Sequence, residues 1–273
     1  MMKICLDAGH YGKYNKSPVI GVYYESDMTW KLQGYLKTEL EKKGFQVVVT
    51  RTNKDVDLAL EARGKKSKDC ELFLSLHSNA GSSTANYSMA CCLINDKTTD
   101  IDDISVDLGK RLADKVTEIM TGKIEAGKVY RRAGNGGTDY YGVLRGAKKV
   151  GTPAILLEHG FHTNFENVDF LLKDENLKKL AVAEAEIIAE YFGKNNTTAL
   201  YNELDKKDFK VKILSNALNI RKQPGMIGEI VGTITDHGVY TIVKTEKVGS
   251  VTWGKLKSGA GWISLHSRYS KRM

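Results

Sequence analysis

Four residues that can bind a metal or move a proton stand at the ends of predicted strands or at the start of a predicted helix. His10 follows the apolar run KICLDAG, His77 follows LFLSL, Glu158 follows AILL, and Glu25 directly precedes the first predicted helix. Ligands bind open α/β sheets at the carboxyl edge of the strands, so we expect these side chains to converge there. Two imidazoles and one carboxylate are the ligand set of a catalytic zinc, which leaves a position for water. The remaining carboxylate can act as a base.

Each of these residues alone has a simpler interpretation. A single histidine after a strand is usually an ordinary loop residue, and Glu25 suits a helix start because the macrodipole favours negative charge there. Their joint placement favours a metal site. His159 and His162 flank Glu158 as an HxxH pair. Because helical zinc motifs rely on regular helix geometry, and this pair follows a strand, we expect neither histidine to bind the metal, while contact with substrate stays open.

Alternating apolar strands and amphipathic helices account for the first 193 residues. The pattern predicts strands at 3–7, 45–50, 72–76, 88–94 and 154–157, and helices at 27–43, 58–68, 104–120 and 177–191. Strands that are apolar on both faces and separated by helices predict an α/β fold, with a mostly parallel sheet flanked by helices. Residues 122–150, rich in Gly, Arg and Tyr, predict a surface loop that contacts substrate or serves as a plain connection.

The pattern changes after Gly193. Residues 194–208 are polar and lack a period, which is typical of a linker. Residues 209–273 carry short β-like runs separated by glycine-rich turns, which predicts a small all-β barrel. We therefore expect a catalytic domain at 1–193, a linker at 194–208 and a small β domain at 209–273.

The net charge of +8 is concentrated in the tail. Residues 208–273 hold 11 Lys or Arg against 4 Asp or Glu, a net charge of +7. Such a basic module favours a polyanionic partner, which includes nucleic acid, membrane surfaces and anionic cell-wall polymers. The aromatic-flanked basic motifs of the common RNA folds are absent, which argues against nucleic acid. No stretch approaches the roughly 20 apolar residues of a membrane span, so we expect no membrane insertion.

The cysteines and the N-terminus suggest where the chain is made. Cys5, Cys70, Cys91 and Cys92 lie in or beside apolar runs, and their spacing does not match a cysteine metal site, so we expect reduced core residues. The first residues contain no signal-peptide hydrophobic region. We therefore expect synthesis in the cytoplasm without a signal peptide, and export by another route than general secretion.

The motifs of the first 192 residues resemble those of the zinc-dependent N-acetylmuramoyl-L-alanine amidases found in bacterial autolysins and phage endolysins. DAGHYG resembles the first-ligand motif, SLHSNA the third-ligand motif, and EHGFHTN fits the pattern ExGFx(S/T)N that holds the catalytic glutamate. Glu25 stands where the second ligand opens the first helix, and Thr50, Arg51 and Arg63 also recur in this family at such spacing.

The resemblance implies zinc on His10, Glu25 and His77, with Glu158 as the general base. It also implies hydrolysis of the amide bond between N-acetylmuramic acid and L-alanine of the peptidoglycan stem peptide. A phage endolysin that acts on the cell wall after release is the favoured role, and a bacterial autolysin is the alternative. Two other functions stay open: a zinc peptidase that cuts within the stem peptide, and a wall- or nucleic-acid-binding protein without catalysis.

The tail resembles a bacterial SH3 domain across residues 209–267. The resemblance rests on LNIRKQPGMIG, TWGKL and AGWISL. It implies recognition of peptidoglycan cross-bridges or another wall component, with Tyr240, Trp253 and Trp262 as candidate contacts. The alternative is that the tryptophans belong to the core of the small barrel. His237 and His266 are expected on the surface, and the sequence indicates no oligomeric state.

Overall fold

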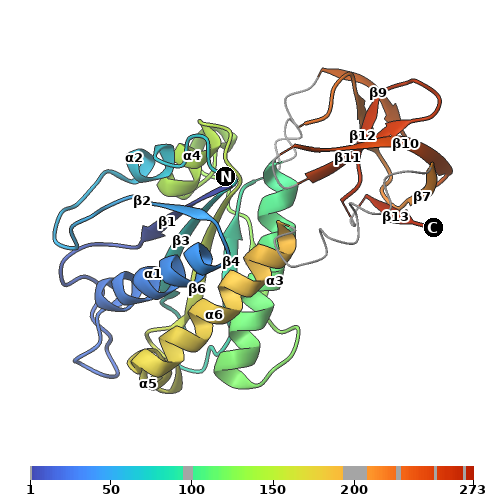
Figure 1. The fold of residues 1–273 in the computed structure, drawn as a ribbon. Helices are drawn as coiled ribbons and strands as arrows, with labels where there is room; N and C mark the ends of the chain where they lie inside the picture. Colours follow the sequence, from blue (N-terminus) through green and yellow to red (C-terminus); the bar gives the residue numbers. More distant parts are fainter. Residues whose placement is uncertain (1, 95–100, 193–207, 226–228, 249–250, 267–268) are drawn as a thin grey trace. The chain divides into compact units, whose positions relative to one another are not determined.

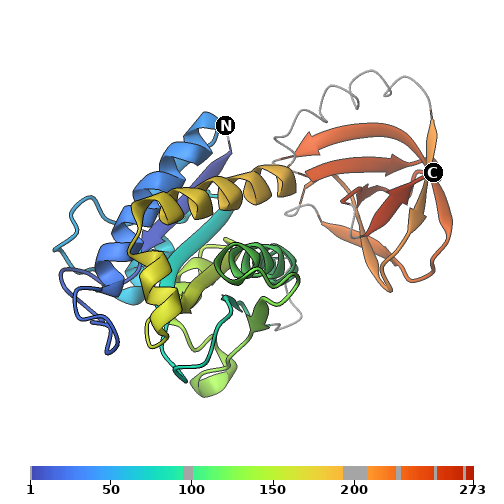
Figure 2. The ribbon, with the colours of Figure 1, turned by 90° about the horizontal axis from the view of Figure 1, so that it is seen from below.

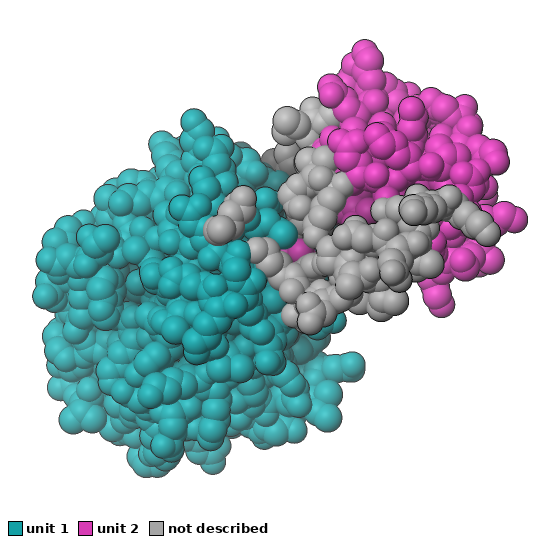
Figure 3. All heavy atoms as spheres, in the orientation of Figure 1, with its two compact units in different colours: residues 1–191 teal, residues 192–273 magenta. Residues whose placement is uncertain are grey.

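The chain forms two compact units, Met1–Tyr191 and Phe192–Met273 (Figure 3). The computed structural model describes residues 2–94, 101–192, 208–225, 229–248, 251–266 and 269–273. The predicted linker at 194–208 lies outside the described residues except for Asp208. Each unit is described by itself below.

The first unit is built on one six-stranded sheet with the order β2-β1-β3-β6-β4-β5. Its strands are β1 (Lys3–Ala8), β2 (Gln46–Val49), β3 (Leu72–Asn79), β4 (Met89–Cys92), β5 (Lys128–Tyr130) and β6 (Ala154–Phe161). All neighbouring pairs are parallel except β6 with β4, which is antiparallel. The prediction of a mostly parallel sheet is confirmed, and the reversed direction of β4 and β5 was not predicted.

Helices cover both faces of this sheet (Figures 1 and 2). On one face lie α1 (Glu25–Lys42), α3 (Ile101–Thr121) and α6 (Asp174–Tyr191), with the short α5 (Phe165–Leu171) leading into α6. On the other face lie α2 (Leu60–Lys65) and α4 (Gly142–Lys148). The stripe Leu32, Leu36 and Leu40 of α1 is fully buried, as the helical period predicts. The helix ends at Lys42, and the expected stop, Gly44, has a φ of 79°.

The segment 122–150 is not the plain surface loop that its composition predicted. It contains β5, a 3₁₀ turn at Asn135–Gly137 and α4. Val143, Leu144 and Ala147 of α4 are buried against the sheet. A Cβ on Gly146 would lie 2.2 Å from the carbonyl oxygen of Glu61, so this glycine lets α4 approach the α2 backbone. Gly146, one of the glycines that indicated a loop, therefore serves helix packing.

All four cysteines are buried and free, as predicted. Among the described residues, no helix has both the length and the apolar composition needed to cross a membrane.

The second unit is all β, as predicted, with one antiparallel sheet of order β13-β7-β10-β11-β12-β8-β9. Its strands are β7 (Phe209–Ile213), β8 (Leu218–Arg221), β9 (Ile230–Ile234), β10 (Val239–Val248), β11 (Val251–Leu256), β12 (Trp262–Ser264) and β13 (Ser270–Arg272). Its own apolar core gathers Val211, Ile213, Ile242, Leu256 and Ile263. This architecture is consistent with an SH3-like barrel.

Candidate metal centre

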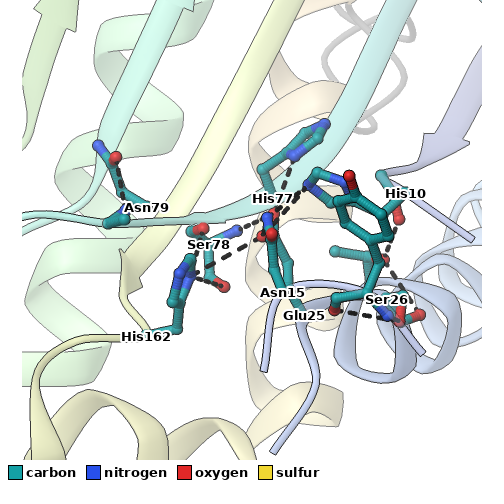
Figure 4. Close-up of polar contacts among 12 residues, drawn as sticks. His10, Asn15, Glu25, Ser26, His77, Ser78, Asn79 and His162 are labelled. Atoms are coloured by element: carbon teal, nitrogen blue, oxygen red, sulfur yellow. Dashed lines mark hydrogen bonds and ion pairs between the residues drawn. The ribbon is translucent and has the colours of Figure 1, made fainter. Parts of the chain in front are cut away.

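The structure brings the three predicted metal ligands together at the carboxyl edge of the sheet (Figure 4). His10 lies in the loop after β1, Glu25 is the first residue of α1, and His77 lies near the end of β3. One ligand atom from each residue lies within 4.8 Å of the others. Glu25 joins the two rings, because its Oε2 is 3.2 Å from His10 Nε2 and its Oε1 is 2.9 Å from His77 Nδ1.

The carboxylate of Glu25 is buried and fully engaged. The backbone N–H of Ser78 donates to its Oε1 at 3.0 Å, and Asn15 Nδ2 donates to its Oε2 at 2.7 Å. Burial acts to raise its pKa, but the hydrogen bonds and charges of His10 and His77 outweigh burial and hold the pKa below its usual range. Glu25 is therefore ionised at neutral pH, which is the state that a metal ligand requires.

Glu158 lies directly beside this cluster, because β3 and β6 pair in a register that sets it opposite His77. Paired residues of neighbouring strands point to the same face of a sheet. Its Oε2 is buried and makes no hydrogen bond to any described residue. Burial, reinforced by repulsion from Glu25, raises the pKa of Glu158 well above its ordinary value. A carboxyl group of this kind suits proton transfer near neutral pH.

The strands that carry His77 and Glu158 extend beyond their predicted ends. β3 continues to Asn79 and β6 to Phe161, so both residues lie within strands rather than after them. The apolar runs end earlier because a polar side chain at the edge of the sheet can face an open site while its backbone stays paired.

Two arginines fix the loop that carries His10. Arg51 Nη2 donates to the carbonyl of Ala8 at 2.7 Å, and Arg63 donates to the carbonyls of Ala8 and His10 at 3.1 and 3.2 Å. His10 itself has a left-handed backbone with a φ of 60°, which non-glycine residues adopt infrequently. The arginines thus hold a backbone turn that would otherwise be unfavourable.

Gly9 allows this loop to lie against β3. A Cβ at this position would come within 2.4 Å of His77 Cε1 and 2.6 Å of the Leu76 carbonyl oxygen. The backbone N–H of Gly9 donates to that same carbonyl at 3.0 Å. Only glycine permits so close an approach between the first and third ligand segments.

The two histidines that flank Glu158 have different surroundings. His159 is fully buried, and its ring bonds to Glu184 of α6 and to the His77 carbonyl, both at 3.0 Å. This places its ring on the α6 face of the sheet, away from the cluster. His162 Nδ1 lies 2.9 Å from the Ser78 carbonyl and 3.8 Å from Glu25 Oε2, so His162 borders the cluster.

Three contributors to the site had no sequence signal that identified them. Asn15 bonds to Glu25 from a loop where its φ is 51°, a conformation that asparagine tolerates well. Ser78 bonds to Glu25 through its backbone, and the buried Tyr23 donates to the Ser78 hydroxyl at 2.8 Å. Backbone donors and loop residues of this kind become visible only once the chain is folded.

The residues present fit a zinc ion. Two imidazole nitrogens and a carboxylate are the donor set of catalytic zinc sites, and ligand atoms around tetrahedral zinc are separated by about 3 Å. The distances of 3.2 and 2.9 Å from Glu25 to His10 and His77 are of this size. The partnerless oxygen of Glu158 adds a buried acceptor at the same edge. An α/β sheet with these groups is the arrangement of a candidate metal-dependent hydrolase.

Comparison with known proteins gives the family. Residues 4–190 match the family model described as N-acetylmuramoyl-L-alanine amidase (Amidase_3). Because the match spans more than half of the chain, this protein belongs to that family, which confirms the family predicted from its motifs.

Solved structures share the fold. The catalytic domain of CwlV, an N-acetylmuramoyl-L-alanine amidase from Bacillus (Paenibacillus) polymyxa, superposes with a TM-score of 0.57 and 24% identity, over 71% of this chain and 100% of that one. Cwp6 from Clostridium difficile gives a TM-score of 0.57 and 26% identity. The match covers 69% of this chain but only 29% of Cwp6. A Bacillus subtilis relative called "Uncharacterized protein YqiI" is 26% identical over 191 residues, which is 69% of this chain and 84% of that protein.

The aromatic residues predicted to contact a ligand in the second unit are mostly covered. Trp253 and Trp262 are only 2% and 7% exposed, which agrees with the alternative of buried residues. Tyr240 is half-buried and donates to Asp236 at 2.8 Å. His237 is exposed as expected, whereas His266 is half-buried beside Tyr269.

Proposed function

We propose that the first unit is a zinc-dependent amidase that cleaves the bond between N-acetylmuramic acid and L-alanine of peptidoglycan. The observation that carries the proposal is the register of β3 and β6, which sets Glu158 beside the cluster of His10, Glu25 and His77. Membership of the amidase family supplies the identity of the bond.

His10, Glu25 and His77 would hold the ion, and Glu158 would move the proton. When bound there, zinc supplies a Lewis acid that makes water more acidic and polarises a carbonyl. Glu158 accepts the proton of the attacking water, which its raised pKa allows near neutral pH. Glu158 then delivers this proton to the amide nitrogen, because an unprotonated amine leaves poorly. Ser78 and Asn15 donate hydrogen bonds to the Glu25 carboxylate and hold it between the two rings.

Metal analysis of ligand variants tests the cluster. Replacing His10, Glu25 or His77 with Ala removes one of three donors, so we expect zinc content to fall sharply in each purified variant. His237→Ala, which removes an exposed imidazole of the second unit and no proposed ligand, is the matched control. About one zinc per chain in all three ligand variants would rule out this ligand set.

Replacing Glu158 with Gln separates metal binding from turnover. The variant should keep zinc, because Glu158 is not a proposed ligand, and should lose about 100-fold to 10,000-fold in turnover, as expected for a general acid–base group. Zinc content, circular dichroism and the rate of muropeptide hydrolysis are measured on the same sample. Turnover within a few-fold of the parent, with fold and metal intact, would contradict the proposed role.

Product analysis identifies the bond. A zinc peptidase that cuts within the stem peptide would use the same chemistry, so mass spectrometry of digested peptidoglycan must decide between them. We expect free stem peptides that begin with alanine and glycan strands without peptide. Shortened peptides still attached to muramic acid would favour the peptidase.

We further propose that the second unit holds the enzyme on the wall and that the activity serves lysis, as in a phage endolysin. The +7 charge of residues 208–273 supports attachment to a polyanionic wall. Added protein should reduce the turbidity of a suspension of wall-exposed cells, and the Glu158→Gln variant should not. Trimming of the wall without loss of turbidity would point to an autolysin with a maturation role.

A further inference from the structure

We propose that the β13–β7 edge of the second unit binds a phosphodiester-linked anionic polymer of the cell wall through Lys210, Lys212 and Lys271 on one face of this edge and Arg272 on the other. The choice of a cell-wall source rests on the proposed function. The surface itself is inferred from strand register, charge pairing and one cavity.

The register of β7 and β13 brings two lysines together. Lys212 and Lys271 are direct cross-strand partners, and both are exposed. Side chains of such partners share a face and begin about 5 Å apart, so two like charges placed there destabilise the sheet. Lys210 lies on the same face, two residues earlier along β7. On the other side of β7, Val239 and Thr241 of β10 face Lys212 and Lys210 and bring no negative charge.

Some other lysines of this unit have acidic partners, although Lys255 has none among the described residues. Lys222 pairs with Glu229 at 3.1 Å, and Lys257 pairs with Asp208 at 2.9 Å. Within the described part of the chain, Lys210, Lys212 and Lys271 form no ion pair with a carboxylate, although they gather on one face. Among the described residues, no carboxylate side chain therefore compensates the positive charge of these three lysines, and a bound anion would do so.

Arg272 follows Lys271 on β13 and pairs with the buried Val211, so it lies on the opposite face of this edge from the three lysines. There it adds a guanidinium with an unused donor. Its guanidinium carbon lies 3.8 Å from the centre of the Phe209 ring, and its Nη1 is buried without a hydrogen-bond partner among the described residues. Arg272 and Phe209 line a cavity of about 350 Å³, together with Lys271, Val211, Leu214, Leu265 and Ser270. A buried N–H group without an acceptor is costly, and an anionic oxygen is the acceptor that a guanidinium binds most strongly.

The spacing of these groups suits a chain of phosphates better than a single anion. Lys210 and Lys212 are about 7 Å apart along the strand, since each residue advances about 3.3 Å. Ammonium groups act as point charges toward phosphate, and the guanidinium adds directed hydrogen bonds. Single-stranded nucleic acid, which is also a phosphodiester, requires open aromatic faces for base stacking. The aromatic ring that lines the cavity, Phe209, is already stacked with Arg272.

Pelleting of the full chain on purified walls tests the proposal. Walls that carry their phosphodiester polymer are compared with the same walls after acid removal of the polymer, and soluble poly(glycerol phosphate) is used as competitor. The test variant is Lys212→Gln with Lys271→Gln, and Arg272→Gln is tested separately. The matched control is Lys222→Gln with Lys257→Gln, which removes the same charge from lysines that have acidic partners.

We expect binding to untreated walls to weaken about tenfold in the test variant and much less in the control, as the loss of two charge contacts implies. The parent should bind stripped walls weakly, and the polymer should compete. The thermal midpoint of the test variant should equal or exceed that of the parent, because the Lys212–Lys271 repulsion is removed.

Three results would each overturn the proposal: equal binding of the parent to stripped and untreated walls, an equal loss in test and control variants, or competition by single-stranded DNA as strong as that by poly(glycerol phosphate). Muropeptide hydrolysis by the parent is measured alongside. If the parent does not hydrolyse muropeptide, the proposed amidase function is contradicted, and the pelleting comparison still tests polymer binding.

Discussion

Glu25 is the residue that links the elements of the candidate site. It opens α1, contacts His10 after β1 and His77 on β3, and receives a hydrogen bond from the Ser78 backbone. The Tyr23 hydroxyl in turn holds Ser78. Groups that surround metal ligands in this way fix their orientation and raise metal affinity. We therefore expect the position of each ligand to be sensitive to small changes behind it.

Gly9→Ala should disrupt the site without removing a ligand. The added methyl group would meet the His77 ring and the Leu76 carbonyl at distances no real Cβ shows, so the two ligand segments must move apart. We expect loss of zinc affinity, measured by competition with a chromophoric chelator, and a lower thermal midpoint. Gly34→Ala is the control, because Gly34 is exposed on α1 with free space around it and should stabilise the helix by about 1 kcal/mol. Unchanged zinc affinity in Gly9→Ala would refute this account of the glycine.

At the scale of elements, β6 carries two functions on its two faces. Glu158 faces the candidate metal centre, and its neighbour His159 faces α6, where it bonds to Glu184. Burial lowers the pKa of His159, but the charge and hydrogen bond of Glu184 outweigh burial and raise it above the ordinary value. This buried pair ties the catalytic strand to the helix that covers it.

The His159–Glu184 pair should make stability depend on pH with a defined sign. Because the folded pKa of His159 is raised, the pair's contribution is fully present below the unfolded value of about 6.5 and is lost as pH rises through the folded value. Glu184→Gln should therefore lower the free energy of unfolding by about 2 kcal/mol near pH 6 and by less near pH 9. Urea unfolding between pH 5.5 and 9 measures the difference. The control is Glu186→Gln, at an exposed position on the same helix, which should show no such trend. If Glu184→Gln lowers the free energy of unfolding by the same amount at every pH, the charged pair is contradicted.

Most elements could be predicted because their apolar periods are local. The stripe of α1 and the apolar runs of β1 and β3 determine their own structure, and the parallel order follows from the alternation of strands and helices. The antiparallel placement of β4 could not be predicted, because it depends on which strand its backbone meets. Likewise α4 was missed, since Gly142 and Gly146 indicate a loop unless the α2 backbone against them is known.

The residues of the candidate site could be predicted from the sequence, but the hydrogen bonds that hold them in place could not. His10, Glu25, His77 and Glu158 follow from motif spacing, and the structure places them together. Arg51 and Arg63 were part of the family resemblance, but their contacts were not predicted, because their bonds to backbone carbonyls join segments more than forty residues apart with no periodic signal between them.

At the scale of the whole molecule, the two compact units have separate apolar cores and different charge. The second unit carries most of the net positive charge, and every proposed zinc and base residue lies in the first. We therefore expect the proposed chemistry and the proposed wall attachment to be independent functions of the two units.

Expressing the units separately tests this division. Residues 1–193 should hydrolyse soluble muropeptide unaided, and residues 209–273 should pellet with intact wall without cutting it. Loss of the second unit should weaken activity on whole walls far more than on small fragments, because a tether raises the local concentration of enzyme. Part of the attachment should fall as salt rises, since exposed charges are screened beyond about 8 Å at physiological ionic strength. A folded, zinc-loaded first unit that cannot cut the small substrate, or a folded second unit that never pellets, would refute this division.

The anchoring of the His10 loop by Arg51 and Arg63 has a consequence for how the enzyme acquires its metal. Both guanidiniums bond to main-chain oxygens rather than to the side chains proposed to hold the metal, so we expect folding alone to assemble the proposed metal site. Zinc should then bind and dissociate without unfolding of the protein. A chelator should abolish hydrolysis while leaving the far-ultraviolet spectrum intact, and added zinc should restore turnover at once, with no refolding phase.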